Sequence, residues 1–253
     1  MIKQIVFLIV GLAALSCNKE KPEPITETAT SKNVTVSINH FWGAENTPLI
    51  LNQEYIHPET GEDFNFQACD YYLSNFQLRK NDGTWWMHPH AYHLVRVTNS
   101  HNYEFELTDV PFGEYDSVRF LIGVDSAKNV SGAQAGDLAP SNAMFWSWST
   151  GYIMIKLEGN STQANWEFFS FHIGGFRDSD NTNVTRWKEF NFEENKLNVR
   201  QAATSKMTLH VDVSKTWNTN NTLAEFSALH TAGGIGHTMS NQFSNGITLN
   251  SID

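Results

Sequence analysis

The residues best suited to chemistry lie in one tract near the middle of the chain, where residues 86–90 read Trp-Met-His-Pro-His and His93 follows. Successive side chains of an extended strand alternate between its two faces, so Trp86, His88 and His90 share one side if the tract is extended. Imidazole nitrogens on one face are a ligand set for a transition metal, and copper, zinc, iron and nickel all accept them. The alternative is a surface strand or loop with scattered histidines.

Two further histidines stand where an expected strand meets a loop, a common place for a binding site. His172 follows an aromatic run and precedes a Gly-Gly pair, and His40 ends the first expected strand. We therefore predict His88, His172 and His40 as metal ligands. For His172 and His40, the alternative is a buried core histidine that bonds a backbone carbonyl. His90 and His93 are expected to face solvent or to support the ligands from outside the metal.

An antiparallel β fold must position these residues, because the chain repeats short apolar or aromatic runs closed by turn residues. Roughly eight to ten strands with hairpin-sized gaps predict an all-β fold, a β-sandwich or flattened barrel with long loops. A long loop rich in Gly, Ala and Ser is expected at 128–143, and one short C-terminal helix at 223–230. The expected strands are 34–41, 71–79, 92–97, 103–107, 117–124, 152–157, 166–172, 185–192 and 207–213.

The amino terminus has the form of a lipoprotein signal peptide. Residues 1–16 contain Lys3 and an apolar run too short to cross a bilayer, and the small residues before Cys17 resemble a bacterial lipoprotein box. Residues 17–32 lack periodicity, as expected of a flexible tether. A lipid on Cys17 would anchor the protein in the bacterial cell envelope, facing the periplasm or the cell surface. The alternative is an apolar start with an incidental cysteine.

Residues 33–253 are expected to form one domain, since no linker rich in Pro, Gly and Ser divides them. The chain has 27 acidic and 17 basic residues and no basic run to hold phosphates, so nucleic acid is not an expected partner. With Cys17 lipidated only Cys69 remains, and no disulfide framework is expected. Cys69 lies among apolar and aromatic residues and should be buried.

The usual signatures of enzymes are missing. The sequence has no G-x-S-x-G elbow, phosphate-binding glycine loop, H-E-x-x-H pair or dinucleotide-binding fingerprint. No pair of acid and base groups is recognisable from spacing. We therefore do not expect an enzyme.

Several motifs resemble those of one family. They are Phe-Leu-Ile-Gly-Val-Asp at 120–125, Met-Phe-Trp-Ser-Trp-Ser-Thr-Gly-Tyr at 144–152, and Phe-Ser-Phe-His-Ile-Gly-Gly at 169–175. The Tyr-Tyr-Leu-Ser-Asn run at 71–75 and the Pro-Phe-Gly-Glu-Tyr turn at 111–115 are similar to the same family. On these motifs, nearly the whole mature chain resembles the MbnP family, extracytoplasmic copper-binding proteins named for a member encoded with methanobactin genes.

The resemblance implies a β-sandwich that binds one copper ion through two imidazoles, with a tryptophan oxidised to kynurenine as an added ligand. In relatives a partner dihaem protein of the cytochrome c peroxidase type performs this oxidation. In some members the modified tryptophan lies two residues before a ligand histidine, which matches Trp86 and His88. An indole N–H only donates, whereas the amine and carbonyl of kynurenine can face a metal. Some relatives carry Asn-His where this chain has Asn129 and Val130, so a ligand from that position is missing.

Two functions follow from these observations. The first is a copper-binding lipoprotein that captures, stores or hands over copper through Trp86, His88 and His172. The alternative is a cell-surface binding or adhesion sandwich without a metal site, in which side chains such as Trp85, Trp86 and Trp187 contact a glycan or a protein. The first requires His88 and His172 within reach of one metal, and the second requires a flat exposed aromatic face.

Overall fold

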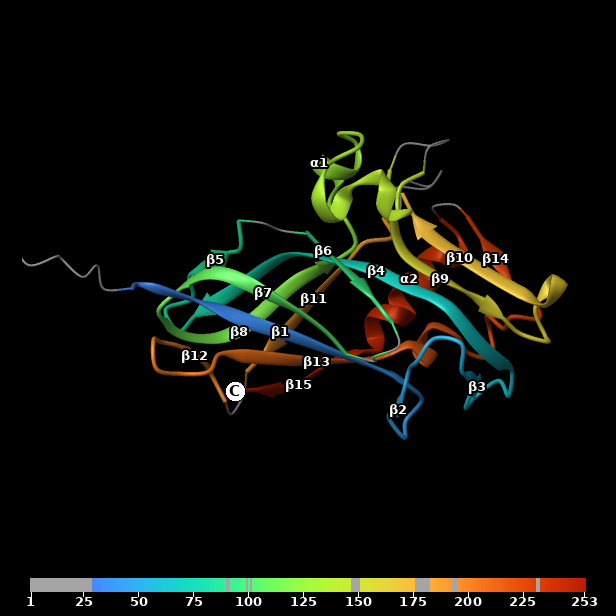
Figure 1. Ribbon diagram of the computed structural model, residues 1–253, viewed down its shortest axis with the longest axis horizontal. Coiled ribbons are helices and arrows are strands. Elements are labelled where there is room, and N and C mark those ends of the chain that lie inside the picture. The colour runs from blue at the N-terminus through green and yellow to red at the C-terminus, as the bar shows by residue number, and fades with distance from the viewer. Residues whose placement is uncertain are drawn as a thin grey trace, which may run out of the picture.

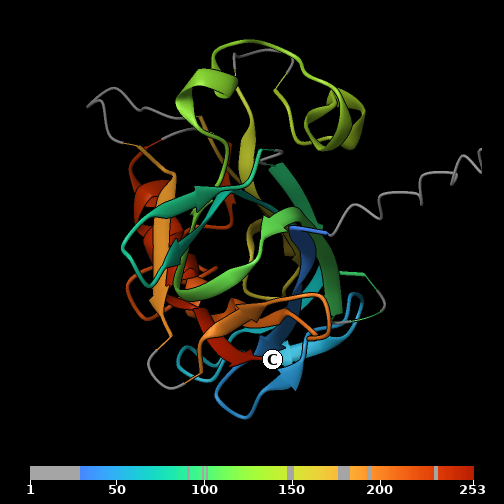
Figure 2. The same cartoon turned by 90° about the vertical axis from the view of Figure 1, so that its left-hand side faces the viewer.

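The computed structural model describes residues 29–89, 92–98, 100, 102–146, 151–175, 183–192, 195–230 and 233–253. These residues form two curled, mostly antiparallel sheets packed as a sandwich, seen from the side in Figure 1 and turned by 90° in Figure 2. The all-β prediction is confirmed. The strands are β1 (Ser31–Trp42), β2 (Thr47–Pro48), β3 (Glu54–Ile56), β4 (Asp63–Lys80), β5 (Trp85–Met87), β6 (Tyr92–Arg96), β7 (Asn102–Pro111), β8 (Gly113–Ile122), β9 (Ile153–Asn160), β10 (Phe168–Gly174), β11 (Arg186–Asn191), β12 (Leu197–Val199), β13 (Lys206–Asp212), β14 (Ala228–Leu229) and β15 (Ile247–Ile252). The helices are α1 (Ser126–Asn129) and α2 (Ile235–Asn245), with short 3-10 turns at η1 (Gly136–Leu138), η2 (Pro140–Asn142), η3 (Asn165–Glu167) and η4 (Val213–Thr216).

The first sheet is built around β1, which runs parallel to β13 and antiparallel to β7. β15 extends the sheet beyond β13, and the short β2 pairs with the end of β1. Val34, Val36 and Ile38 alternate along β1 and are fully buried, as the period of a strand with one face on the core requires. The predicted strand 34–41 is therefore the centre of a sheet.

The second sheet is built around β4, a strand of 18 residues whose two edges hold different partners. One edge pairs with β9 and then with β8, and the other edge pairs in turn with β3, β6 and β5. β10 and β14 continue the sheet beyond β9, while β11 and β12 lie beyond β8. β4 and β9 therefore lie between β10 on one side and β5 and β6 on the other.

One cluster of buried apolar side chains fills the space between the sheets. Aromatic rings dominate it: Phe64 lies 4.8 Å from Trp217 and 5.5 Å from Phe169, measured between ring centroids. Cys69 is fully buried in this core as a free thiol, as predicted, and burial raises its pKa well above the ordinary value. Cys69 therefore packs in the core as a small apolar residue.

The predicted helix at 223–230 is wrong. That segment forms turns and β14 (Ala228–Leu229), which adds to the edge of β10. The C-terminal helix is α2 (Ile235–Asn245), which follows a Gly-Gly pair and buries Met239 and Phe243. Its composition is largely polar, so its apolar stripe is too thin to stand out in the sequence, and tertiary packing decides its position. Neither helix of the described residues is long and apolar enough to span a membrane.

The loop expected at 128–143 carries η1 and η2 and stands above the second sheet, at the top of Figure 1. Tyr152 holds it in place, because its hydroxyl donates to the carbonyl of Leu138 at 3.0 Å and accepts from the amide of Gln134 at 3.2 Å. The loop is therefore an ordered part of the fold.

Candidate metal centre

β5 and β6 follow one another along one edge of β4, both antiparallel to it, and bring Trp86, His88 and His93 together there. Trp86 lies in β5, and the amide of His88 donates to the carbonyl of Phe76 in β4 at 2.9 Å. His93 lies in β6 opposite Leu73 of β4. Residues on either side of Pro89 thus meet beside the middle of β4.

His88 and His93 form a pair of nearly parallel rings, here called the imidazole pair. Their centroids are 6.0 Å apart with an interplanar angle of 24°. His93 also stacks on Phe105 of β7 at 3.8 Å and meets Phe76 edge-on at 5.9 Å. Because β7 belongs to the first sheet and β6 to the second, the imidazole pair lies between the sheets, and His88 is only 3% exposed.

The ring of His93 has an unsatisfied nitrogen. Its Nε2 is buried and lacks a hydrogen-bond partner among the described residues, a condition rare enough in folded proteins to call for an explanation. Burial, reinforced by the neighbouring His88, lowers the pKa of His93 to about 4. The ring is therefore neutral at ordinary pH and has a lone pair to offer. A bound metal would satisfy such an atom.

Thr108 of β7 orients the other ring. Its amide donates to Nε2 of His88 at 3.0 Å, and its hydroxyl oxygen lies 3.3 Å from the same nitrogen. With Nε2 accepting, the proton of a neutral ring sits on Nδ1. A protonated Nε2 would face the Thr108 amide donor, so Thr108 favours the tautomer with the proton on Nδ1. A metal on His88 would have to displace either that proton or the hydrogen bond from Thr108.

Trp86 lies beside the imidazole pair, half-buried against the core. Its ring centroid is 5.8 Å from that of His88 with an interplanar angle of 54°, so the two share one side of the chain as strand alternation predicts. His90, predicted to share this side, lies outside the described residues. Trp85 has a different environment: the guanidinium of Arg119 lies 4.1 Å over its ring. Of the two tryptophans in β5, Trp86 is therefore the one that adjoins the imidazoles.

In the described part of the chain, no group of three or more His, Cys, Asp or Glu side chains is placed to hold a metal ion. The imidazole pair thus supplies the histidines of such a site, and a further donor must come from another residue type. Imidazoles without a carboxylate suit copper, zinc, iron or nickel, whereas magnesium and calcium prefer oxygen ligands. The donor set is compatible with copper and does not by itself select it.

His172 is not brought to His88. It pairs with Lys156 of β9, which in turn pairs with Asp70 of β4. His88 lies at the opposite edge of β4, beside Phe76, six residues further along the strand. At about 3.3 Å per residue this offset alone is roughly 20 Å. The expectation that His88 and His172 share one metal is therefore wrong, because two strands and part of the length of β4 separate them.

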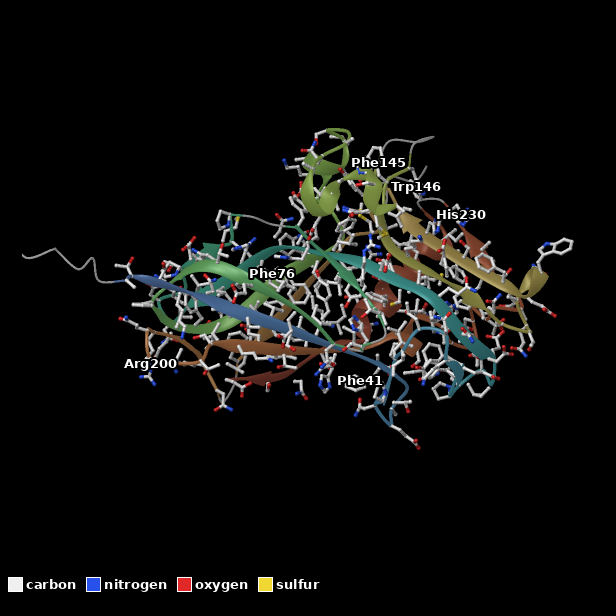
Figure 3. The ribbon with its side chains drawn as sticks, in the orientation of Figure 1. Phe41, Phe76, Phe145, Trp146, Arg200 and His230 are labelled. Carbon is white, nitrogen blue, oxygen red and sulfur yellow. The ribbon has the colours of Figure 1, made fainter. Side chains whose placement is uncertain are left out.

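His172 contacts a different set of polar side chains. Its Nε2 lies 2.7 Å from Oε1 of Glu158, and its ring stacks on His230 with centroids 4.4 Å apart. The bond from His172 is the largest influence that lowers the pKa of Glu158. Nε2 of His230 lies 2.8 Å from the hydroxyl of Ser170. In Figure 3, His230, which stacks on His172, lies on the right, far from Phe76, whose carbonyl accepts from the amide of His88.

His40 is also apart from the imidazole pair. It is fully buried, and its Nε2 lies 2.8 Å from the hydroxyl of Tyr71, so its ring bonds a core side chain. Along β1 it is four residues beyond Val36, the partner of Phe105, which is roughly 13 Å at strand spacing. His40 is thus the core histidine of the alternative interpretation, with a tyrosine in place of a backbone carbonyl.

His93 is the site residue that sequence reasoning missed, since it was expected to face solvent or to support the ligands. β5 ends at Met87 and pairing with β4 resumes at Tyr92, so the alternation of faces starts anew in β6. His93 has the same parity as the buried Val95, but Leu94 of the opposite parity is buried too. Parity within β6 therefore does not identify His93, and its packing on Phe105 of the other sheet does.

The position where some relatives carry a histidine faces solvent. Val130 is 55% exposed, while Asn129 is buried and accepts from the amide of Tyr152 at 2.7 Å. Asn129 therefore supports the loop at 128–143, and Val130 supplies no ligand.

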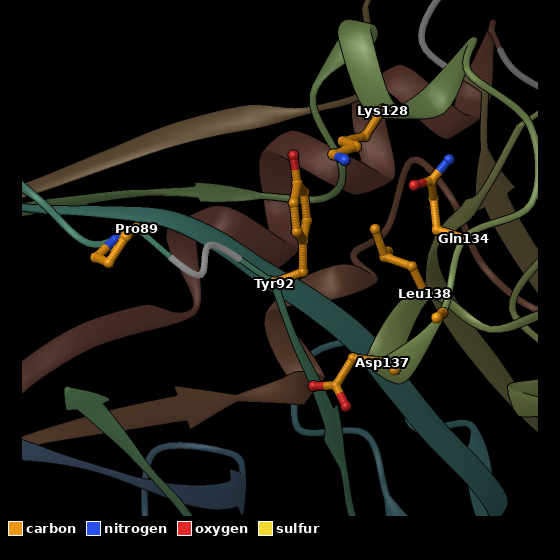
Figure 4. Close-up of a pocket in the computed structure, with 8 residues that line it drawn as sticks. Pro89, Tyr92, Lys128, Gln134, Asp137 and Leu138 are labelled. Atoms are coloured by element: carbon orange, nitrogen blue, oxygen red, sulfur yellow. The ribbon is translucent and has the colours of Figure 1, made fainter.

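A pocket of about 470 Å³ borders the loop between His88 and His93 (Figure 4). It is lined mainly by Pro89, Tyr92, Lys128, Gln134, Asp137 and Leu138. Tyr92 precedes His93, so their side chains leave β6 on opposite sides, and the Tyr92 hydroxyl donates to Asp125. The pocket thus approaches Pro89 and β6 from the outer side of the second sheet.

Comparison with known proteins agrees with this architecture. A family model described as MbnP matches residues 31–232. The structure is similar to that of MbnP from Methylosinus trichosporium, with a TM-score of 0.50 and 14% sequence identity, over 80% of this chain and 82% of that one. No curated protein matches the chain. At this identity the structural likeness shows the fold alone, whereas the family match spans most of the sequence.

Proposed function

Since the chain belongs to the MbnP family, we propose that it is an extracytoplasmic copper-binding protein that captures, stores or hands over copper without catalytic turnover. One copper ion would be held by His88 and His93, with His93 in the role first expected of His172. The observation that supports this most is the buried, unsatisfied Nε2 of His93 in a ring 6.0 Å from His88. Equilibrium copper titration of the purified protein tests it, with one ion per chain expected.

The chain's own residues prepare the site for such an ion. Bound copper would supply a redox-active cation, and two neutral imidazoles hold either of its oxidation states. The low pKa of His93 keeps its lone pair available down to about pH 4. Phe76 and Phe105 exclude water from the ring of His93, and Thr108 orients His88.

Trp86 is the proposed source of a further donor. A partner dihaem protein of the cytochrome c peroxidase type would oxidise it to kynurenine, whose amine and carbonyl can face a metal as an indole cannot. Its half-buried ring beside His88 supports this assignment. We expect protein from its native host to be about 4 Da heavier than the same mature chain with an unmodified Trp86, through a net gain of one oxygen and loss of one carbon. Intact-mass measurement checks this, and the gain should disappear in Trp86→Phe but persist in Trp85→Phe. An unshifted native mass would leave copper with the two imidazoles alone.

The protein is further proposed to be anchored in the bacterial cell envelope through a lipid on Cys17, facing the periplasm or the cell surface. The apolar run that stops at Cys17 supports this. We expect the full chain to partition into the detergent phase and a Cys17→Ser variant to remain in the aqueous phase. Equal partition of the two proteins would exclude the lipid.

A cell-surface binding or adhesion protein remains the second candidate, and one observation favours it. Trp187 is 55% exposed on the outer face of the second sheet, where it and Trp85 flank Arg119. The guanidinium already covers part of both rings, at 4.1 Å from Trp85 and 5.8 Å from Trp187. Loss of glycan or protein binding on Trp187→Ala, together with an absence of copper binding, would favour this function.

A further inference from the structure

One end of the sandwich exposes an unusual concentration of apolar side chains. It is formed by β3, the turn between β9 and β10, and the segment before β14, and is here called the hairpin end. Trp166 is 98% exposed, Ile56 59%, Phe226 43% and Phe168 40%. These are four of the seven exposed large apolar side chains in the described residues. Such a concentration marks an interaction site more often than chance.

The elements of the hairpin end lie next to one another, because strand pairing connects them across the second sheet. Register partners run from Glu54 of β3 to Asn65 of β4, from there to Asn160 of β9, and from there to Phe168 of β10. The segment before β14 joins next, because the amide of Ser170 donates to the carbonyl of Ser227 at 2.9 Å. The exposed side chains therefore belong to one surface.

A hydrogen-bonded turn holds the side chain of Trp166 outward. The backbones of Trp166 and Glu167 are left-handed, with φ of 61° and 55°, a conformation that is unfavourable for residues other than glycine. The turn is nevertheless fastened, since the amide of Glu167 donates to Ala164 at 3.0 Å and the side chain of Asn160 donates to the carbonyl of Glu167 at 3.0 Å. A rigid, exposed tryptophan is a typical anchor of a protein interface.

The charged side chains beside this anchor are acidic. No Lys or Arg of the described residues lines the depression next to it, and Lys156, the nearest basic residue before the β9–β10 turn, lies 3.3 Å from Glu158. Beside Trp166, a depression of about 310 Å³ is lined in part by Glu54, Asp63 and Glu167. A surface of this charge attracts a basic protein, and it repels both a second copy of itself and an anionic membrane.

We propose that the hairpin end docks a basic protein partner, with Trp166 inserted as the apolar anchor and Glu54, Asp63 and Glu167 as its charged rim. The position suits this role. β1 begins at the opposite end of the sandwich from the β9–β10 turn (Figure 1), so a tether preceding Ser31 leaves the hairpin end free. The proposal stands independently of copper binding, since none of these residues contacts the imidazole pair.

Cytochrome c, a small basic protein, and its fully acetylated form provide the test, with binding to the purified full chain measured by calorimetry at low and at physiological salt. We expect binding to cytochrome c and none to the acetylated form. Trp166→Ala should weaken binding about tenfold or more, and Glu167→Lys about threefold or more. Trp166 is almost fully exposed, so its removal leaves the core intact.

Trp187→Ala and Glu114→Lys are the matched controls, because they change an exposed tryptophan and an exposed carboxylate elsewhere on the surface. Both should stay within about twofold of the parent, below the effect of a typical anchor. The proposal is overturned if cytochrome c does not bind, or if the controls weaken binding as much as Trp166→Ala. It is also overturned if Trp166 is required for self-association or for binding vesicles of anionic lipid instead.

Discussion

Copper stoichiometry is expected to fall from one ion per chain to near zero in His88→Ala and in His93→Phe, and to stay at one in His172→Phe. Removing one of two imidazole donors leaves no protein pair to hold the ion. The loss should therefore exceed the roughly 10- to 100-fold that follows when only a supporting hydrogen bond is removed. Competition titration against a chelator of known copper affinity, with metal analysis of the purified protein, measures both quantities.

The substitutions are chosen to separate binding from folding. Phenylalanine at position 93 keeps a ring to stack on Phe105, now at 3.8 Å from His93, while it removes both nitrogens. His172 is the matched control, since it too is a partly buried histidine in a ring stack, 4.4 Å from His230. Full copper binding by His93→Phe with loss in His172→Phe would move the centre to β10 and refute the imidazole pair.

Acid is expected to destabilise the copper-free protein between pH 6.5 and pH 4 through His93. In the unfolded chain this ring titrates near 6.5, whereas burial and the neighbouring His88 lower its folded pKa to about 4. Between these values the unfolded state binds a proton that the folded state does not, so the free energy of unfolding decreases as the pH falls. The contribution is fully present above pH 6.5 and lost below pH 4, roughly 3 kcal/mol in all.

Urea unfolding at pH 7, 5 and 4 measures this effect, with His93→Phe as the reference. Other titrating groups act on both proteins, so the difference between the two isolates His93. We expect the gap in unfolding free energy to change by roughly 3 kcal/mol in favour of the variant as the pH falls across this window. Parallel pH dependences would show that the ring of His93 is hydrated in the folded state.

Both predictions depend on one physical feature: the ring of His93 stays neutral because aromatic side chains exclude water from it. A ring that resists protonation down to about pH 4 is poorly suited to an ion pair and well suited to a soft or borderline metal. If the protein binds copper but its unfolding free energy does not fall in acid through His93, the ion is held by a solvent-exposed ring. If the unfolding free energy falls in acid but copper does not bind, His93 is a packing residue.

Much of the fold could be predicted from local pattern. Each of the nine predicted strands lies within or overlaps a strand of the structure. The reason is that apolar residues at every second position, such as Val34, Val36 and Ile38, indicate a strand with one buried face. The helix at 223–230 was wrong for the converse reason. Its apolar residues are divided between the core, where Leu223 is buried, and the edge strand β14, and α2 depends on packing that a local window does not contain.

The sequence by itself determined the fold class, the family motifs and the candidacy of Trp86 and His88, since these depend on residue type and short spacing. The tertiary structure decided which second histidine accompanies them. The local sequence does not distinguish His172 from His93, but pairing of β5 and β6 with the same edge of β4 places the ring centroid of His93 6.0 Å from that of His88. The length of β4 and the width of β9 hold His172 away. Which side chains meet is set by strand pairing and register, and neither is encoded in the local pattern around a single histidine.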